Sequence, residues 1–471
     1  MNHSRRTFIR NSGLASLGFL GLHQCSLTGC RLPDNRVGFG RLTYKKGNIL
    51  SLPEQFSAKV ISQRGKVMSD GLYSPGSHDG MGVFDLDGKK MILVRNHELS
   101  PGSFDEGPFG KSNELYKNVS RDLIYDVAKE SERMCVGGTT TMVYNEESQN
   151  VELEYLSLTG TVRNCSGGKT PWNTWITCEE SPLRKGDENG LLEQNHGYNF
   201  EVPATGKAAL NAPVPIKAMG RFVHESIAVH PQTGIVYQTE DEGNGLIYRY
   251  LPNATGELTA GSLNKGGRLQ CLVLTDWPGA DTRNYPTSKT ETFPERKPFN
   301  VTWIDLDDID APNNDLRLRG HAKGAAIFSS GEGMIYGNNE IYFTASSGGK
   351  AGNGQIFRYT PSTYEGQPTE KDEPGKLELF IESKSLDTFR FCDNITVAPW
   401  GDVIICEDKE DARIIGITPE GKSYVIAQNI GYRESEFAGP AFSPSGKTLF
   451  VNIQTPGLTL AITGPWKKLN S

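Results

Sequence analysis

Acidic residues gather at the open end of a predicted β-hairpin, whose strands are expected over 226–230 and 234–239. Both segments are rich in β-branched residues and flank a Pro-Gln-Thr-Gly turn. Glu225 comes just before the first strand, and Glu240 and Asp241 follow the second. A hairpin brings its open ends together, so these carboxylates should share one edge of a sheet. They repel one another there unless cations lie between them or water solvates each one separately.

A thiol and two carboxylates follow a further predicted strand, at 172–177. They are Cys178, Glu179 and Glu180. A thiolate is a ligand for iron, zinc or copper, whereas carboxylate and amide oxygens suit Ca²⁺ or Mg²⁺. A Cys on its own is more often a small buried apolar residue, but two adjacent glutamates favour a ligand. The sequence therefore indicates a mixed metal site.

Similar side chains stand at other strand ends: Asn96 and Glu98, Glu332, Asp393 and Asn394, and Glu407. Taken singly, each is interpreted as a solvated loop residue or as a side chain bonded to its own backbone. Gathered at one axis, so many like charges would raise each other's pKa and destabilise the fold unless cations bind them. We therefore expect these residues to hold metal together with Cys178, Glu179, Glu225, Glu240 and Asp241.

One pattern recurs along the chain, namely a strand, a tight polar turn, a second strand and then polar or acidic residues. Clear copies run over 83–98, 227–241, 333–344, 395–408 and 440–453. Repeated β-meanders with insertions are typical of radial blades, so we predict an all-β, six-bladed β-propeller. A β-sandwich would need only about seven to nine strands, whereas this pattern spans most of the chain. The segment 174–177 is expected to supply another inner strand, and long inserted loops are expected at 99–135, 181–220 and 276–320.

The segment 1–30 has the features of an export signal. Arg5 and Arg6 closely precede a Gly-rich apolar segment at 14–22, which is too short to span a bilayer. This pattern is typical of the twin-arginine route to the periplasm, which carries folded proteins and so suits one that binds metal before export. Cys30 ends a Leu-Thr-Gly-Cys sequence that resembles a lipobox. Lipid anchoring at Cys30 and cleavage without a lipid both stay open.

Removal of residues 1–30 would change the formal charge from −7 to −10. An acidic protein without a stripe of Lys and Arg is not expected to bind nucleic acid. Six cysteines remain after that removal, with no CxxC or knot spacing, which argues against a disulfide scaffold. No linker or low-complexity tract interrupts residues 31–471, so we expect a single propeller domain and a monomer.

Three stretches resemble the PhoX-type bacterial phosphatases. They are TPWNTWITCEE at 170–180, GRFVHESIAVHPQTGIVYQTEDEG at 220–243, and the CDN and CED segments at 392–394 and 406–408. The twin-arginine signal is a further point of resemblance to this family. The resemblance covers nearly the whole mature chain. It implies a six-bladed propeller that holds Fe³⁺ and Ca²⁺ at one end of its channel. It also implies hydrolysis of phosphate monoesters, and sometimes diesters, outside the cytoplasm.

The resemblance also implies residue roles. Cys178 would ligate iron, and Glu225 and Glu332 would hold the metal cluster. Candidate calcium or bridging ligands would be Glu179, Glu240, Asp241 and Asn96. The family often has an arginine two residues before the glutamate that matches Glu332, and it would bind the substrate phosphate; here that position is Ser330. We expect Arg390 to replace it and to act with Glu225 and Glu332 as the catalytic residues.

In the expected chemistry, metal ions bind the phosphate oxygens of a small ester as Lewis acids and supply the nucleophile for in-line attack. Cys178 would be a ligand rather than a nucleophile, because Glu179 and Glu180 beside it discourage thiolate formation in the absence of metal. Two alternatives stay open: a non-catalytic calcium-binding propeller, and a lactonase-like calcium hydrolase. Iron bound at Cys178 would exclude the lactonase, which needs no thiolate.

Overall fold

The computed structural model describes residues 37–129, 133–254, 256, 258–287 and 290–466. The predicted export signal, with Cys30, lies outside the described residues. Residues Val37–Ser471 form one compact unit. In its described part, no helix has the length and apolar character needed to cross a bilayer.

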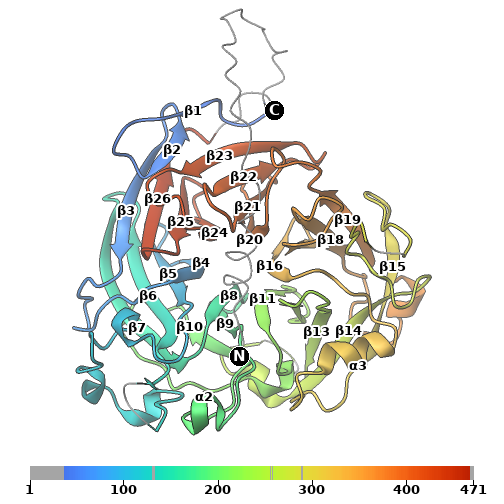
Figure 1. Cartoon of the computed structure of the whole chain (residues 1–471), viewed down its shortest axis with the longest axis horizontal. Coiled ribbons are helices and arrows are strands. Elements are labelled where there is room, and N and C mark those ends of the chain that lie inside the picture. The colour runs from blue at the N-terminus through green and yellow to red at the C-terminus, as the bar shows by residue number, and fades with distance from the viewer. Residues whose placement is uncertain (1–36, 130–132, 255, 257, 288–289, 467–471) are drawn as a thin grey trace, which may run out of the picture. The chain divides into compact units, whose positions relative to one another are not determined.

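The strands of this unit form six antiparallel meanders, which are the blades of a β-propeller (Figure 1). Blade one contains β4 (His78–Asp85), β5 (Lys90–His97), β6 (Gly137–Asn145) and β7 (Asn150–Thr161), and blade two contains β8 (Asn164–Lys169), β9 (Thr174–Glu179) and β10 (Asn199–Pro203). Blade three contains β11 (His224–Val229), β12 (Val236–Glu240), β13 (Ile247–Pro252) and β14 (Gly267–Leu274), with β15 (Phe299–Asp305) along its outer edge.

Blade four contains β16 (Gly331–Gly337), β17 (Glu340–Ala345), β18 (Gln355–Thr360) and β19 (Lys376–Glu382). Blade five contains β20 (Cys392–Val397), β21 (Val403–Glu407), β22 (Arg413–Ile417) and β23 (Ser423–Asn429), and blade six contains β24 (Phe437–Phe442), β25 (Thr448–Ile453) and β26 (Leu458–Thr463). The prediction of an all-β propeller with six blades is confirmed.

The blades close into a ring through their inner strands β4, β8, β11, β16, β20 and β24, which contact one another in that cyclic order. β3 (Ser57–Gln63) pairs with β26, so a strand from early in the chain completes the last blade. β2 (Leu50–Pro53) pairs with β23 and with β1 (Leu42–Thr43), which extends blade five. Both ends of the described chain are thereby fixed to the ring.

Two of the three predicted loops contain a strand. The segment 181–220 includes β10 and the short helix α2 (Asp187–Gly190), and 276–320 includes β15 and most of α3 (Leu316–Ala322). β15 pairs with both β14 and β19, so it joins blades three and four into one continuous sheet. The segment 99–135 carries short 3-10 helices at Phe104–Glu106, Tyr116–Asn118 and Arg121–Leu123.

The inner strand of blade two differs from the prediction. The segment 174–177 belongs to β9, the second strand, and β8 is the strand that contacts β4 and β11. β8 contains Gly167 and Gly168, where an added Cβ would lie 1.9 Å from the Ile176 carbonyl oxygen and 2.2 Å from that of Ile227. Close backbone packing at the axis therefore requires glycine, which removes the β-branched pattern by which strands are recognised.

Apolar side chains pack between each pair of neighbouring blades rather than within one. The cluster between blades two and three, for example, joins Ile176 and Cys178 of β9 to Ile227 and Tyr248 of β11 and β13. Corresponding clusters occupy the other five blade interfaces. A blade buries both of its faces only inside the ring, so ring closure is what fixes the inner strands around one axis.

Candidate metal centre

A β-bulge occurs at the same place in all six inner strands. In β4, for example, His78 pairs with His97 and Met81 with Arg95, so β4 has one more residue than its partner there. The other inner strands show the same shift. The first residues within the bulges are Asp79, Cys165, Glu225, Glu332, Asp393 and Gly439. Because a bulge changes the direction in which a side chain points, five inner strands can present a metal-ligating group at the axis.

These side chains meet others in three groups whose ligand atoms lie within 4.8 Å of one another. The groups are Cys165, Glu180 and Glu225; Glu225, Glu332 and Asp393; and Asp79, Glu98 and Glu436. We name these eight residues the channel cluster. Every blade contributes to it, and Glu225 is shared by two groups. The arrangement could therefore hold several cations side by side, with one bridging carboxylate.

Burial and mutual repulsion dominate the electrostatics of the cluster. Burial, followed by the charges of Glu332 and Glu180, raises the pKa of Glu225 well above its usual value. Burial likewise raises the pKa of Asp393 to about 8. Asp79 Oδ1 is buried without a hydrogen-bond partner. Burial and repulsion thus favour the protonated form of these carboxyl groups, whereas bound cations would favour their ionised form.

Cys165, rather than Cys178, is the thiol that lies with the carboxylates. Cys178 packs in the apolar cluster between blades two and three, and burial alone raises its pKa. Cys165 occupies the bulge of β8 beside Glu180 and Glu225. Burial and then Glu225 raise its pKa well above the usual value. The sequence predicts Cys178 as the thiol ligand, whereas the structure brings Cys165 to the carboxylates.

The acidic pairs at strand ends are divided by the pleat of the sheet. Glu179 points into its blade, where it accepts hydrogen bonds from the backbone N–H of Val162 at 2.9 Å and of Gly197 at 2.8 Å. It also pairs with His196 Nδ1 at 2.6 Å. The next residue, Glu180, belongs to the channel cluster. Successive side chains of an extended segment face opposite sides, so only one member of the pair can reach the channel.

Glu240 shows the same orientation in blade three. It accepts hydrogen bonds from Tyr248 Oη at 2.7 Å and from the Leu246 backbone N–H at 3.1 Å. Burial raises its pKa to about 7, although Arg317 opposes that shift. The next residue, Asp241, interacts electrostatically with Glu180 and Glu332 of the cluster.

Glu407 in blade five is enclosed by two arginines. Arg390 Nη2 lies 2.8 Å from one of its oxygens, and Arg413 Nη2 lies 2.6 Å from the other. The next residue, Asp408, interacts with Asp393 of the cluster. In the described part of the chain, no hydrogen bond or ion pair joins Arg390 to the channel cluster. The structure therefore does not bring the predicted cation Arg390 and the predicted ligand Glu407 to the other candidates.

The two predicted asparagine ligands support the bulges. Asn96 donates to the carbonyl oxygens of Cys165 and Ser166, at 3.2 and 2.7 Å, and accepts from Trp175 Nε1. Asn394 donates to Asp393 and accepts a hydrogen bond from the Gly439 backbone N–H at 2.6 Å. Both amides are engaged with protein atoms, and both fix the backbone from which cluster residues project.

Four cluster members were not among the predicted ligands: Asp79, Cys165, Glu180 and Glu436. A signal for the first two exists in the sequence, because each bulge pairs the ligand with a small or polar residue that follows it. The pairs are Asp79-Gly80, Cys165-Ser166, Glu225-Ser226, Glu332-Gly333 and Asp393-Asn394. Glu436 lies outside its bulge, just before β24, so this signal would not have found it.

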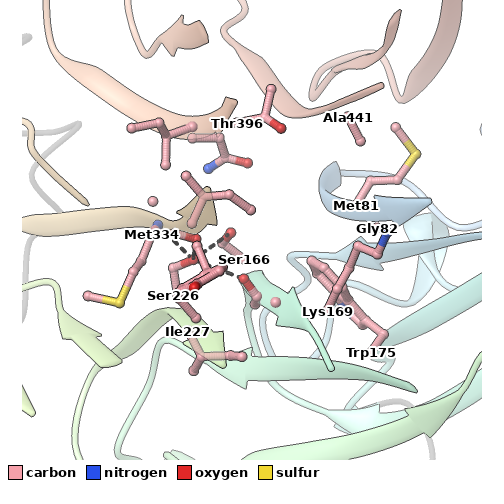
Figure 2. A pocket seen from close by; sticks show the side chains of 18 of the residues that line it. Met81, Gly82, Ser166, Lys169, Trp175, Ser226, Ile227, Met334, Thr396 and Ala441 are labelled. Carbon is pink, nitrogen blue, oxygen red and sulfur yellow. Dashed lines mark hydrogen bonds between the residues drawn. The ribbon is translucent and has the colours of Figure 1, made fainter. Parts of the chain in front are cut away.

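A cavity of about 400 Å³ lies along the inner strands beyond the bulges. Figure 2 shows Met81, Ile227, Met334 and Ala441 around it, and Ser226, whose Oγ donates to the Gly167 carbonyl at 2.9 Å. None of the described residues that line it is Asp or Glu. The carboxylates and the thiol thus lie at or near the bulges, and the cavity is a mainly apolar continuation of the channel.

A six-bladed β-propeller that gathers seven carboxylates and a thiol around its channel defines a class of protein whose channel could hold metal ions. Residues 37–457 match the family of the alkaline phosphatase PhoX, and the chain belongs to that family. The protein is accordingly a phosphoric ester hydrolase. No protein with a curated description matches the sequence.

Among solved structures, that of Pseudomonas fluorescens PhoX has a similar fold. Pseudomonas fluorescens PhoX in complex with vanadate, a transition state analogue, is 17% identical with a TM-score of 0.64, over 91% of this chain and 98% of that one. A gluconolactonase from Xanthomonas campestris is 10% identical with a TM-score of 0.39, over 90% and 100% of the two chains. A luciferin-regenerating enzyme is 9% identical with a TM-score of 0.41, over 87% and 95%.

Proposed function

We propose that the protein is an exported phosphatase that hydrolyses phosphate esters at a mixed cluster of Fe³⁺ and Ca²⁺ in its channel. The observation that supports this most directly is the group of Cys165, Glu180 and Glu225, which shares Glu225 with a second group made only of carboxylates. Family membership supplies the reaction class. The structure of P. fluorescens PhoX in complex with vanadate supports a phosphoryl group as the part of the substrate that binds there.

The donor atoms of the cluster fit this pair of metals. Cys165 offers a thiolate to iron, while the carboxylates of Glu332 and Asp393 are oxygen ligands of the kind that calcium takes. The unpartnered Oδ1 of Asp79 also lies in a group of carboxylates, with Glu98 and Glu436. Cations would relieve the repulsion that, together with burial, raises the pKa of Asp79 and Glu436.

The residues of the chain have distinct roles in this proposal. Glu225 bridges two metal groups, and Glu332 is oriented by a hydrogen bond of 2.6 Å from Ser346 Oγ. Gln454 donates to both Asp79 and Glu98, at 3.0 and 2.8 Å, and so fixes the third group. When bound, the ions supply Lewis-acid stabilisation of the charge that develops during phosphoryl transfer. The rigid inner strands hold the ligands in place for that chemistry.

Export is the second part of the proposal. Arg5 and Arg6 before an apolar segment support the twin-arginine route to the periplasm, and Cys30 is the proposed site of a lipid anchor. We propose a monomer that acts on a small phosphate ester and binds no nucleic acid, in keeping with a net charge of −7.

The test is to express the full chain with its own signal, purify it without chelators, and measure metal content, absorption spectrum and hydrolysis of p-nitrophenyl phosphate together. We expect iron and calcium, a visible thiolate-to-iron band, and turnover that chelators abolish. Calcium without iron, or a folded protein that contains metal but does not hydrolyse phosphate esters, would contradict the proposal. Cell fractionation, with a variant carrying Lys at both Arg5 and Arg6, tests export.

A further inference from the structure

We propose that Arg163 binds the phosphate group of the substrate at the rim of the channel cluster. The inference rests on the proposed phosphatase function and adds a residue that the sequence did not indicate. In the described part of the chain, Arg163 is the one basic side chain with an ion pair to a member of the cluster. Arg390, which the sequence predicted, pairs with Glu407, and Arg317 pairs with Glu240 and Glu242.

The backbone holds Arg163 in a fixed position between the two strands that supply its partners. Its N–H donates to the Leu99 carbonyl at 3.0 Å, and its carbonyl accepts from the Glu180 N–H at 2.9 Å. Its φ of +47° places it in the left-handed region, directly before β8 begins. A non-glycine residue in this conformation is uncommon and requires support from its surroundings, which these two hydrogen bonds provide.

The side chain of Arg163 spans two metal groups. Its Nη2 lies 2.8 Å from Glu98 Oε1, and the same nitrogen contacts Glu180. Glu98 belongs to the group with Asp79, whereas Glu180 belongs to the group with Cys165. The guanidinium therefore stands where the two groups meet, which is where a ligand held by cations of both groups would present its oxygens.

Exposure and hydrogen bonding leave part of this guanidinium available. The Arg163 side chain is 38% exposed, against 15% for Glu98 and 11% for Glu180. Its Nε and Nη2 contact the two carboxylates, while Nη1 makes no hydrogen bond to another described residue. Nη1 can therefore donate to a ligand oxygen that approaches from solvent. A planar guanidinium matches phosphate oxygens better than a point charge does.

Cations in the cluster would strengthen the attraction between Arg163 and a phosphate anion. Without metal, the charge of Arg163 is balanced by Glu98 and Glu180. Once these carboxylates share their charge with bound cations, the guanidinium is balanced less completely and attracts an anion more strongly. A substrate with a dianionic phosphate should gain most from this, so Arg163 would favour phosphate monoesters over diesters.

The experiment compares metal-loaded wild type with Arg163→Gln and Arg163→Lys, and with Arg268→Gln as a control on the exposed side of β14. Arg268 pairs with Asp305 and is 56% exposed. The measurements are metal content, the affinity for inorganic phosphate by calorimetry, and kcat and KM for p-nitrophenyl phosphate and bis-p-nitrophenyl phosphate. Calorimetry requires no turnover, so it tests Arg163 even if the proposed hydrolysis fails.

We expect Arg163→Gln to keep its metals and to weaken phosphate binding at least tenfold, with a larger rise in KM for the monoester than for the diester. Arg163→Lys should lie between Arg163→Gln and wild type, and Arg268→Gln should match wild type. Phosphate affinity within twofold of wild type in a metal-loaded Arg163→Gln protein would overturn the proposal. If Arg163→Gln loses its metals, the same criterion for phosphate affinity is applied to metal-loaded Arg163→Lys. Loss of metal from both variants would show that Arg163 only positions ligands, which also overturns it.

Discussion

Two sets of carboxylates lie one residue apart in this protein and have opposite surroundings. Glu179, Glu240 and Glu407 point into the blades, where backbone N–H groups, a tyrosine hydroxyl, a histidine or arginines contact at least one oxygen of each. Glu180, Asp241 and Asp408 follow them and interact with the channel cluster. Residue type therefore does not distinguish a structural carboxylate from a metal ligand; the partners that the fold supplies do.

The difference lies in what neutralises each charge. Carboxylates inside the blades have protein donors, although Oε1 of Glu240 has only Arg317 at 3.9 Å and no hydrogen bond among the described residues. The channel cluster contains seven carboxylates, with Arg163 as their basic partner among the described residues. A fold that gathers so many like charges must neutralise them with cations or protons. Under the proposed function these are cations, so the two sets should respond in opposite ways to mutation and to chelation.

The largest effect is expected from Glu225→Gln compared with Glu179→Gln. Glu225 belongs to two groups of possible metal ligands, so the Glu225→Gln protein should lose bound metal. Its kcat/KM should fall by about a thousandfold or more. Glu179→Gln should retain metal and keep activity within about threefold. It should lose about 3 kcal/mol of stability, because it weakens the buried pair with His196. Metal analysis, kinetics and urea unfolding check both, and loss of metal from Glu179→Gln alone would reverse the assignment.

The two cysteines permit a second comparison. Cys165→Ser should lose iron, its visible absorption band and most activity, because serine is a poor ligand for iron. Cys178→Ser should keep all three and lose about 1–2 kcal/mol, since its hydroxyl would enter the apolar cluster between blades two and three. Spectra and metal content of the two proteins side by side decide the matter. An iron band lost in Cys178→Ser and retained in Cys165→Ser would restore the prediction made from the motif.

Chelation should destabilise the protein in a pH-dependent way. The folded protein raises the pKa of Asp393 to about 8 and those of Glu225 and Glu332 in the same direction. Between about pH 4 and pH 8 the metal-free folded state then binds more protons than the unfolded state, so its stability falls as pH rises. We expect chelation to lower Tm by about 5 °C or more at pH 8 and by less at pH 5. Equal shifts at both values would contradict this electrostatic account.

The smallest effect is expected from Gly439→Ala at the bulge of blade six. Gly439 has a φ of +59°, and an added Cβ would lie 2.6 Å from the Asp79 carbonyl oxygen. We expect a loss of about 1–3 kcal/mol and a several-fold fall in activity as Asp79 moves. Gly88→Ala is the matched control, because Gly88 has a φ of +79° and open space around its added Cβ. Similar losses of activity in both variants would contradict a role of the Gly439 bulge in positioning Asp79.

Much of the architecture was predictable from short-range pattern. The recurring strand, turn and strand units located the hairpins of five blades, since β-branched runs and turn residues act locally. The pairing of His224 with Glu240 places Glu225 and Asp241 at one sheet edge, as the hairpin predicted. The inner strand of blade two was not predicted, because Gly167 and Gly168 are required by the close packing of neighbouring strands and have low strand propensity.

The sequence by itself determined that thiols and carboxylates stand at the ends of strands that converge in a propeller. It also placed Glu98, Glu225, Glu332 and Asp393 among the candidates that the structure brings together. Tertiary structure alone decided which member of each acidic pair faces the channel and that Cys165 replaces Cys178 there. The physical reasons are three. The pleat sends the two members of an acidic pair to opposite sides, a bulge changes which residue of an inner strand faces the channel, and six separate inner strands become neighbours only when the ring closes.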